Sequence, residues 1–234
     1  MPWILALIGL AILAAAGGLY LLYGGSAPAA VGLTGGSPGA STHGVLSGGL
    51  PGTWTVDPSV GSFSDFSGTF AGYRVEEQLA GVGANTAVGR TPDVTGTMVI
   101  DGTTVTTASF EVNLTTLQSD SGMRDGQLAR QGLQTSQFPK ATFKLTSPIQ
   151  LGTAPADGQT VSVTAVGDLT IHGVTKSVRL PLQAKLSGAV ITVVGSLTIP
   201  FGDYGMTAPE SMRVLSIKDP GTLELQLQLS KSSS

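Results

Sequence analysis

The amino-acid sequence predicts an all-β fold, an antiparallel β-barrel with one short helical excursion, preceded by a transmembrane helix. Three observations lead to this prediction. Apolar and polar residues alternate in many runs beyond Trp54, short polar turns separate these runs, and the first 56 residues contain no Lys, Arg, Asp or Glu. Alternation directs successive side chains to opposite faces of a strand, so each strand has one apolar and one polar face.

The N-terminal stretch 3–23 contains 21 residues without a charge. A helix of about 20 apolar residues spans the hydrocarbon core of a bilayer, and Trp3, Tyr20 and Tyr23 lie where aromatic side chains prefer the membrane interface. A signal peptide usually has a basic start and an apolar core of about 7 to 15 residues, and this stretch has neither. We therefore expect 1–23 to be an uncleaved anchor; a signal cleaved near "APA" at 27–29 and a buried core helix are the alternatives.

Residues 24–52 have the composition of a disordered linker, with ten Gly, three Pro, four Ser and four Ala. All charged residues fall within the following domain, expected at 53–231, which is long enough for one sizeable core. The net charge of −3 and the absence of a Lys/Arg cluster argue against a nucleic-acid partner.

The alternating runs place the strands in sequence order. They are expected near 54–57, 68–77, 95–101, 104–114, 141–149, 160–171, 176–187, 189–200 and 222–230. Short turns between sequential strands favour an antiparallel meander, and closing such a sheet removes its exposed edges. Pro181 has no N–H to donate, so a bulge or an unpaired stretch is expected beside it.

The segment 117–139 interrupts the alternation between two predicted strands. Its apolar residues, with Asp120 or Ser121 as an N-cap, predict an irregular or short helical excursion that covers one mouth of the barrel. Arg124 and Asp125 in this segment could place a polar group at that mouth, although surface ion pairs are common and contribute little.

The sequence offers little for catalysis or metal binding. There is no Cys, the acids are dispersed, and His172 is the one histidine of the predicted barrel. The sequence "TIHGVTKS" puts His172 in a hairpin turn, where hydrogen bonding to the backbone is its simplest role and a place at the barrel rim is the alternative. No metal, cofactor or enzymatic activity is therefore expected.

Four motifs in this order resemble the YceI-like family: "WTVDPSVGSF" at 54–63, "RDGQL…FPKATF" at 124–143, "GDLTIHGVTKSVRL" at 167–180 and "FGDYGM" at 201–206. The resemblance covers about 54–230. It implies an extracytoplasmic bacterial protein with a lipocalin-like eight-stranded barrel, and several members bind a long isoprenoid or other lipid chain in the lumen. Members often have His where this chain has Gln127.

The resemblance and the apolar strand faces together predict a membrane-tethered protein with an isoprenoid or fatty lipid as partner. A homodimer is kept as an alternative assembly, and a packed barrel that acts in protein interaction or stress protection is the alternative function. Arg124, Asp125 and His172 are the candidates for a polar mouth. The expected lumen lining comprises Phe66, Phe70, Phe110, Val112, Leu114, Leu117, Met123, Leu128, Leu133, Phe138, Phe143, Leu169, Ile171, Leu180, Ile199, Phe201, Tyr204 and Met206.

Overall fold

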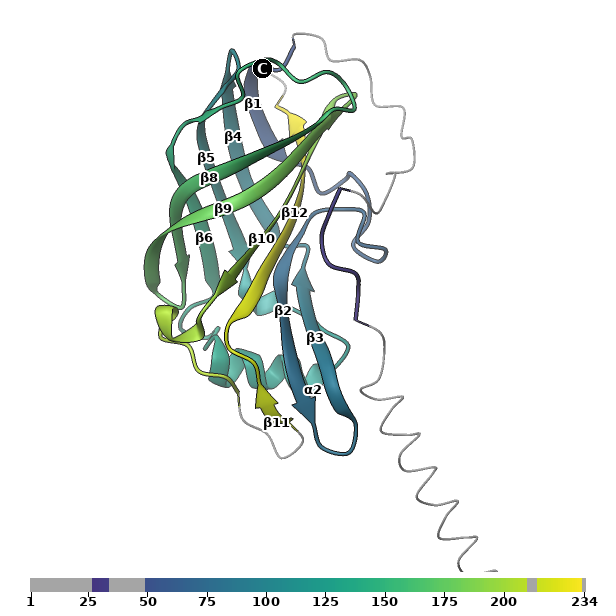
Figure 1. Cartoon of the computed structure of the whole chain (residues 1–234), viewed down its shortest axis with the longest axis vertical. Coiled ribbons are helices and arrows are strands. Elements are labelled where there is room, and N and C mark those ends of the chain that lie inside the picture. The colour runs from purple at the N-terminus through teal and green to yellow at the C-terminus, as the bar shows by residue number, and fades with distance from the viewer. Residues whose placement is uncertain (1–26, 34–48, 210–213, 233–234) are drawn as a thin grey trace, which may run out of the picture.

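The computed structural model describes residues 27–33, 49–209 and 214–232, which form one antiparallel β-barrel with short helical segments at one end (Figure 1). The strands are β1 Gly52–Val56, β2 Phe70–Leu79, β3 Gly83–Thr91, β4 Val94–Asp101, β5 Thr104–Asn113, β6 Lys140–Ser147, β7 Ile149–Gln150, β8 Thr160–Ile171, β9 Val174–Ser187, β10 Val190–Ile199, β11 Val214–Ile217 and β12 Gly221–Lys231. The helical segments are η1 Leu114–Thr116, α2 Gly122–Gln127, η2 Leu128–Gly132 and η3 Phe201–Tyr204.

The predicted anchor, 1–23, lies outside the described residues. Within the part of the chain that the structure describes, none of the helices has the length and apolar character to cross a bilayer.

Eight strands close the barrel in the order β1-β4-β5-β6-β8-β9-β10-β12, and β12 pairs back to β1. The closing register joins Trp54 to Lys231 and Val56 to Leu229. The predicted antiparallel eight-stranded barrel with a short helix is therefore confirmed. Closure leaves every inward-facing side chain directed at one enclosed space.

Besides β10 and β1, β12 pairs with a third strand, β2. Its C-terminal part pairs with β1, whereas its N-terminal part, Thr222 to Gln226, pairs with Arg74 to Phe70 of β2. β2 carries β3 and β11 as further partners. Sequence reasoning missed these two strands, because β3 ("GANTAVGRT") is built from small and polar residues and β11 has four residues.

Pro181 marks the point at which two strands separate. β9 pairs with β8 through Pro181 without a register shift, but its pairing with β10 runs only from Ser187 to Leu182. The Pro nitrogen cannot donate a hydrogen bond, so the predicted unpaired stretch lies on the β10 side.

The helical segments between β5 and β6 lie at the end of the barrel that also carries η3 and the β8–β9 turn (Figure 1). We call this the α2 end. Ser121 caps α2, because its Oγ accepts a hydrogen bond from the Arg124 backbone N–H at 3.4 Å.

A buried cluster of charges lies on the outer face of the barrel. Glu224 of β12, with a side chain only 2% exposed, accepts hydrogen bonds from Arg74 Nε at 2.8 Å and Arg90 Nη2 at 3.0 Å. The same two arginines donate to the backbone carbonyls of Pro28 (2.6 Å) and Ala29 (2.8 Å). Residues 27–33, shown in dark purple in Figure 1, belong to the range expected to be a linker, and these hydrogen bonds hold them against the barrel.

Two phenylalanines complete this cluster. The Arg90 guanidinium lies 4.4 Å from the ring centre of Phe66 and 4.3 Å from that of Phe70, within the range of cation–π attraction. Phe70 pairs with Gln226, which faces outward from β12. Both phenylalanines therefore belong to the outer face. The sequence analysis had expected them in the lumen, and that prediction is wrong.

Residues 27–33 continue across the neighbouring strands. Val31 lies in a shallow groove on the outside of β8, β9 and β10, where Val194 forms part of the floor. Val194 is only 3% exposed although it points away from the lumen. This cover, together with the cluster around Glu224, gives the barrel a second buried layer outside the sheet.

We predict that Glu224→Gln lowers the free energy of unfolding by about 3 to 5 kcal/mol, because it leaves the buried guanidinium of Arg90 and the partly exposed one of Arg74 without their carboxylate. Glu76→Gln is the matched control. It removes an ion pair to Lys218 whose side chains are 67% and 64% exposed, and such pairs contribute about 1 kcal/mol or less. Urea unfolding of both variants measures the difference. Equal losses for the two variants would show that the buried cluster does not stabilise the barrel.

Candidate functional site

The lumen of the barrel is an apolar cavity of about 310 Å³. Its walls follow from the strand alternation: in β12, for example, Leu223, Leu225, Leu227 and Leu229 all line it, whereas Gln226 and Gln228 face outward and bind the loop that precedes β2. A volume of about 10 to 15 Å³ on this measure already admits one water molecule. The inward-facing side chains therefore leave a space much larger than a packing defect.

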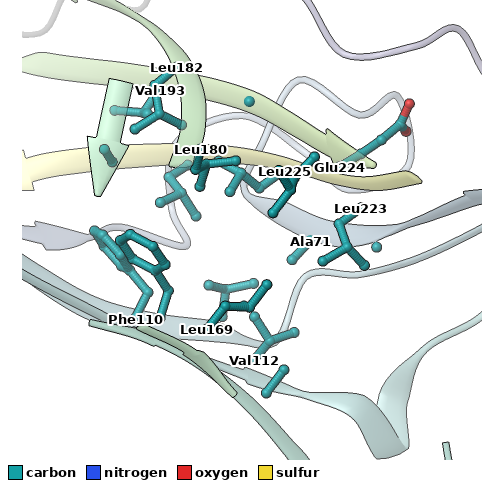
Figure 2. A pocket seen from close by; sticks show the side chains of 18 of the residues that line it. Ala71, Phe110, Val112, Leu169, Leu180, Leu182, Val193, Leu223, Glu224 and Leu225 are labelled. Carbon is teal, nitrogen blue, oxygen red and sulfur yellow. The ribbon is translucent and has the colours of Figure 1, made fainter. Parts of the chain in front are cut away.

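Figure 2 shows two walls of side chains facing one another across this space. Leu180, Val193 and Leu225 come from β9, β10 and β12, and Phe110, Val112 and Leu169 come from β5 and β8. The carboxylate of Glu224 points away from the lumen in the same view. The wall accordingly offers hydrocarbon and aromatic surface over most of its area.

Small residues at inward positions explain why the lumen is not filled. Several of the lining residues carry a methyl group or no side chain, among them Ala71, Ala108, Ala165, Ala184 and Gly195. The sequence contains this signal, since these residues occupy the inward parity of their strands. The sequence analysis listed only large residues and so missed them.

Most of the expected lining residues do line the cavity. They are Phe110, Val112, Leu114, Leu117, Leu128, Leu133, Phe143, Leu169, Ile171, Leu180, Ile199, Phe201 and Met206. The cavity also receives Leu50, Ile100 and Leu151 from the opposite end of the barrel. It therefore extends from the α2 end to the end that carries the β4–β5 turn.

The other expected lining residues lie elsewhere. Phe66 and Phe70 contact Arg90 on the outer face, as described above. Met123 on α2 is 58% exposed. Phe138 packs against the ring of His172, with 4.5 Å between ring centres, and Tyr204 is buried with Ile171 and Ile199. Met123, Phe138 and Tyr204 do not belong to strands, so alternation could not place them.

His172 is a turn residue outside the cavity wall. Together with Gly173 it forms the two-residue connection between β8 and β9, and both residues have positive φ (51° and 73°), as a type I′ hairpin requires. Its Nδ1 lies 3.1 Å from the Tyr204 carbonyl oxygen and its Nε2 lies 3.1 Å from Gln134 Oε1. The ring thus ties the hairpin to η3 and to the segment after η2.

Arg124 is the charged group of the α2 excursion that lines the cavity. Its Nη2 donates to Glu77 Oε1 at 2.7 Å, and its Nη1 is paired with Asp120. Burial alone would lower the pKa of Arg124, but the two carboxylates outweigh it and raise that pKa. Asp125 does not line the wall and accepts hydrogen bonds from Ser119 N (3.0 Å) and Oγ (2.6 Å), which fixes the loop before α2.

Tyr73 is a polar wall residue that sequence reasoning missed. It pairs across the sheet with Leu223, so it shares the inward face, and it lines the cavity near Arg124. Its hydroxyl is buried without a hydrogen-bond partner. Burial raises the pKa of Tyr73 above its usual value, so the hydroxyl keeps its proton at neutral and moderately alkaline pH. The alternation of Tyr73 and Val75 with Arg74 and Glu76 is the signal that could have placed it.

No three His, Cys, Asp or Glu side chains among the described residues come together in a way that could hold a metal ion. The site is therefore best described as an elongated apolar lumen with Arg124 and Tyr73 at its α2 end.

Comparison with solved structures finds the same fold in several bacterial proteins. A polyisoprenoid binding domain from Saccharophagus degradans, implicated in plant cell wall breakdown, is 16% identical, with a TM-score of 0.57 over 76% of this chain and 98% of that one. Burkholderia cenocepacia BcnA is 19% identical, with a TM-score of 0.53 over 76% and 99% of the two chains. The YceI protein of Campylobacter jejuni is 15% identical, with a TM-score of 0.50 over 62% and 85%.

No curated protein sequence matches the chain significantly. Residues 54–229, however, match the YceI-like domain, and this range spans the barrel from β1 almost to the end of β12. The chain belongs to the YceI-like family.

Proposed function

We propose that the chain is a membrane-tethered, extracytoplasmic binding protein that holds a long-chain isoprenoid or another lipid in its lumen. The observation that carries this proposal is the apolar cavity of about 310 Å³ that runs along the barrel. Burying one CH₂ group contributes about 0.8 kcal/mol, so three prenyl units would supply on the order of 10 kcal/mol before the costs of ordering the ligand. The Saccharophagus degradans relative, a polyisoprenoid binding domain of the same fold, supports the same ligand class.

The cavity also distinguishes this proposal from the alternative of a packed barrel. A packed barrel requires the inward-facing side chains to interdigitate along the whole axis. Here small residues such as Ala108 and Ala165 lie between the large ones. The residues that line the cavity come from both ends of the barrel, so the side chains do not interdigitate along the whole axis. Lipid binding is therefore the function that this geometry favours.

The lumen proposal can be tested with two variants that place the same side chain on opposite faces of β5. Ala108→Phe adds a ring to the cavity wall, whereas Ser109→Phe adds it to the exposed face one residue later. We expect native mass spectrometry of the full chain to show bound lipid in the wild type and in Ser109→Phe. Ala108→Phe should lose at least three quarters of that occupancy, because the added ring fills space that the lipid chain needs.

Equal occupancy in the two variants would contradict binding in the lumen. Complete absence of lipid from the wild type, together with no uptake of an added prenyl alcohol, would contradict lipid binding altogether. The same spectra report the mass of the assembly and so test the homodimer.

The proposed membrane attachment rests on the predicted anchor at 1–23 and on residues 27–33, which hydrogen bonds hold against the barrel. The predicted span ends at Tyr23, and the Pro28 carbonyl is held by Arg74. Five residue steps (28 − 23) reach at most about 18 Å in an extended chain. An anchored chain would therefore keep the barrel close to the bilayer surface.

We expect the full chain to remain in the membrane pellet after an alkaline wash. Leu13→Asp puts a carboxylate at the centre of the predicted span, where an Asp costs about 2.5 to 3.5 kcal/mol, and it should release a measurable fraction of the protein. Ala30→Asp, an exposed position outside the span, is the control and should stay in the pellet. Release of the wild-type chain by the wash would contradict the anchor.

A further inference from the structure

Residues 27–33 run along the outside of the barrel in a defined direction. β12 starts beside η3, at the α2 end, and runs away from that end. Pro28 is held by the arginine of β2 that pairs with Thr222, near the start of β12. Val31 lies beside the residue of β10 that pairs with Gln226, further along β12. The segment therefore begins towards the α2 end, and its first residues are the ones nearest in sequence to the predicted anchor.

The short connection between the anchor and the segment limits how the barrel can stand on a bilayer. The proposed anchor ends at Tyr23, and the five residue steps (28 − 23) to Pro28 span at most about 18 Å. Past Arg74, which holds Pro28, β2 continues for five residues (79 − 74) to Leu79, a rise of about 17 Å beyond the level of that contact. The α2 end thus reaches about as far as the connection does, so an anchored barrel has this end against the bilayer surface.

The helix at this end exposes an apolar side chain and turns its charges inward. Arg124 Nη2 donates to Glu77 Oε1 at 2.7 Å, and Asp125 accepts from the Ser119 backbone N–H at 3.0 Å. Met123, directly before this charged pair, is 58% exposed. A helix face in contact with water usually has the reverse distribution, with charges outside and apolar side chains inside.

Leu215 of β11 is the other large apolar side chain that is exposed among the described residues, at 66%. The register of β11 against β2 shifts at this residue, and a β-bulge of this kind redirects a side chain. Ile217 of β11 pairs with Glu77, the residue that binds the arginine of α2. Figure 1 shows α2 and β11 at the same end of the molecule, so Met123 and Leu215 both belong to the α2 end.

We propose that the α2 end docks on the bilayer surface, with Met123 and Leu215 inserted among the lipid head groups, and that the lumen takes up its lipid through this contact. The inference rests on the proposed anchor and the proposed lipid ligand, and it assigns the surface through which they meet. The lining of the lumen reaches this end through Leu117, Leu128 and Met206. A lipid chain then passes from one apolar environment to another with little exposure to water.

Fluorescence quenching tests the docking in the full chain, held in phosphatidylcholine nanodiscs whose two faces are open to the buffer. The chain contains no Cys, so one introduced Cys carries the fluorophore nitrobenzoxadiazole at a single position. The variants are Met123→Cys, Leu215→Cys and the control Ala154→Cys, an exposed position in the loop after β7 at the opposite end of the barrel.

We expect 5-doxyl phosphatidylcholine in the disc to quench the labels at 123 and 215 by roughly half or more, because apolar side chains at an interface lie at the boundary of head groups and acyl chains. The label at 154 should be quenched only by iodide in the buffer. Quenching of all three labels by iodide alone would overturn the docking. Protection of 123 and 215 from iodide without quenching by the doxyl lipid would assign this surface to a protein partner and would also overturn it.

Uptake of geranylgeraniol from the disc, followed by native mass spectrometry, tests the route into the lumen. The double variant Met123→Asp, Leu215→Asp should slow uptake roughly 10-fold relative to the control Ala154→Asp, because a carboxylate resists insertion into the interface. Equilibrium occupancy in detergent solution should be the same in both variants, which verifies that each is folded.

An unchanged uptake rate in the double variant would overturn the route through the α2 end. Failure of the wild type to take up geranylgeraniol in detergent would instead reject the lipid-binding function, and failure of the wild type to stay in the disc would reject the anchor. The three failures are therefore distinguishable.

Discussion

The pairing of β12 with β1 is the constraint on which the rest of the structure depends. One edge of β12 pairs with β10 along nearly all of its length. The other edge pairs with β1 at the C-terminal end and with β2 at the N-terminal end. Because the sheet closes, its apolar faces have no surface to bury other than one another. The period-two alternation therefore produces one lumen, and every large inward residue contributes to a single wall.

A closed barrel whose side chains do not fill its lumen must obtain part of its stability elsewhere. Here the outer face of β10 and β12 supplies it: Gln228, 2% exposed, is bonded to Thr192 and to the Ser67 carbonyl, and Gln226 binds the carbonyls of Phe66 and Gly68. The loop before β2 and residues 27–33 thus cover polar positions that would otherwise face water. With this second layer outside the sheet, small residues inside the lumen can leave room for a ligand.

Alternation was sufficient to predict the barrel, most strand bounds and the lining residues that lie on strands, which are Phe110, Val112, Phe143, Leu169, Ile171, Leu180 and Ile199. It failed where long-range contacts decide the outcome. Phe66 and Phe70 look like core residues, but the buried Arg90 attracts both rings to the outer face. Tyr73 escaped notice because an unpaired hydroxyl is visible only once its neighbours are known. The motif containing His172, in contrast, predicted the β8–β9 turn, because a two-residue hairpin turn depends on the local sequence and not on long-range contacts.

The central claim is that the lumen is a space for a lipid chain, and an experimental structure of the full chain with its co-purified ligand tests it most directly. The account predicts continuous elongated density along the barrel axis, between Leu180 and Phe110. A lumen occupied by rearranged protein side chains, or by separate water peaks alone, would contradict it.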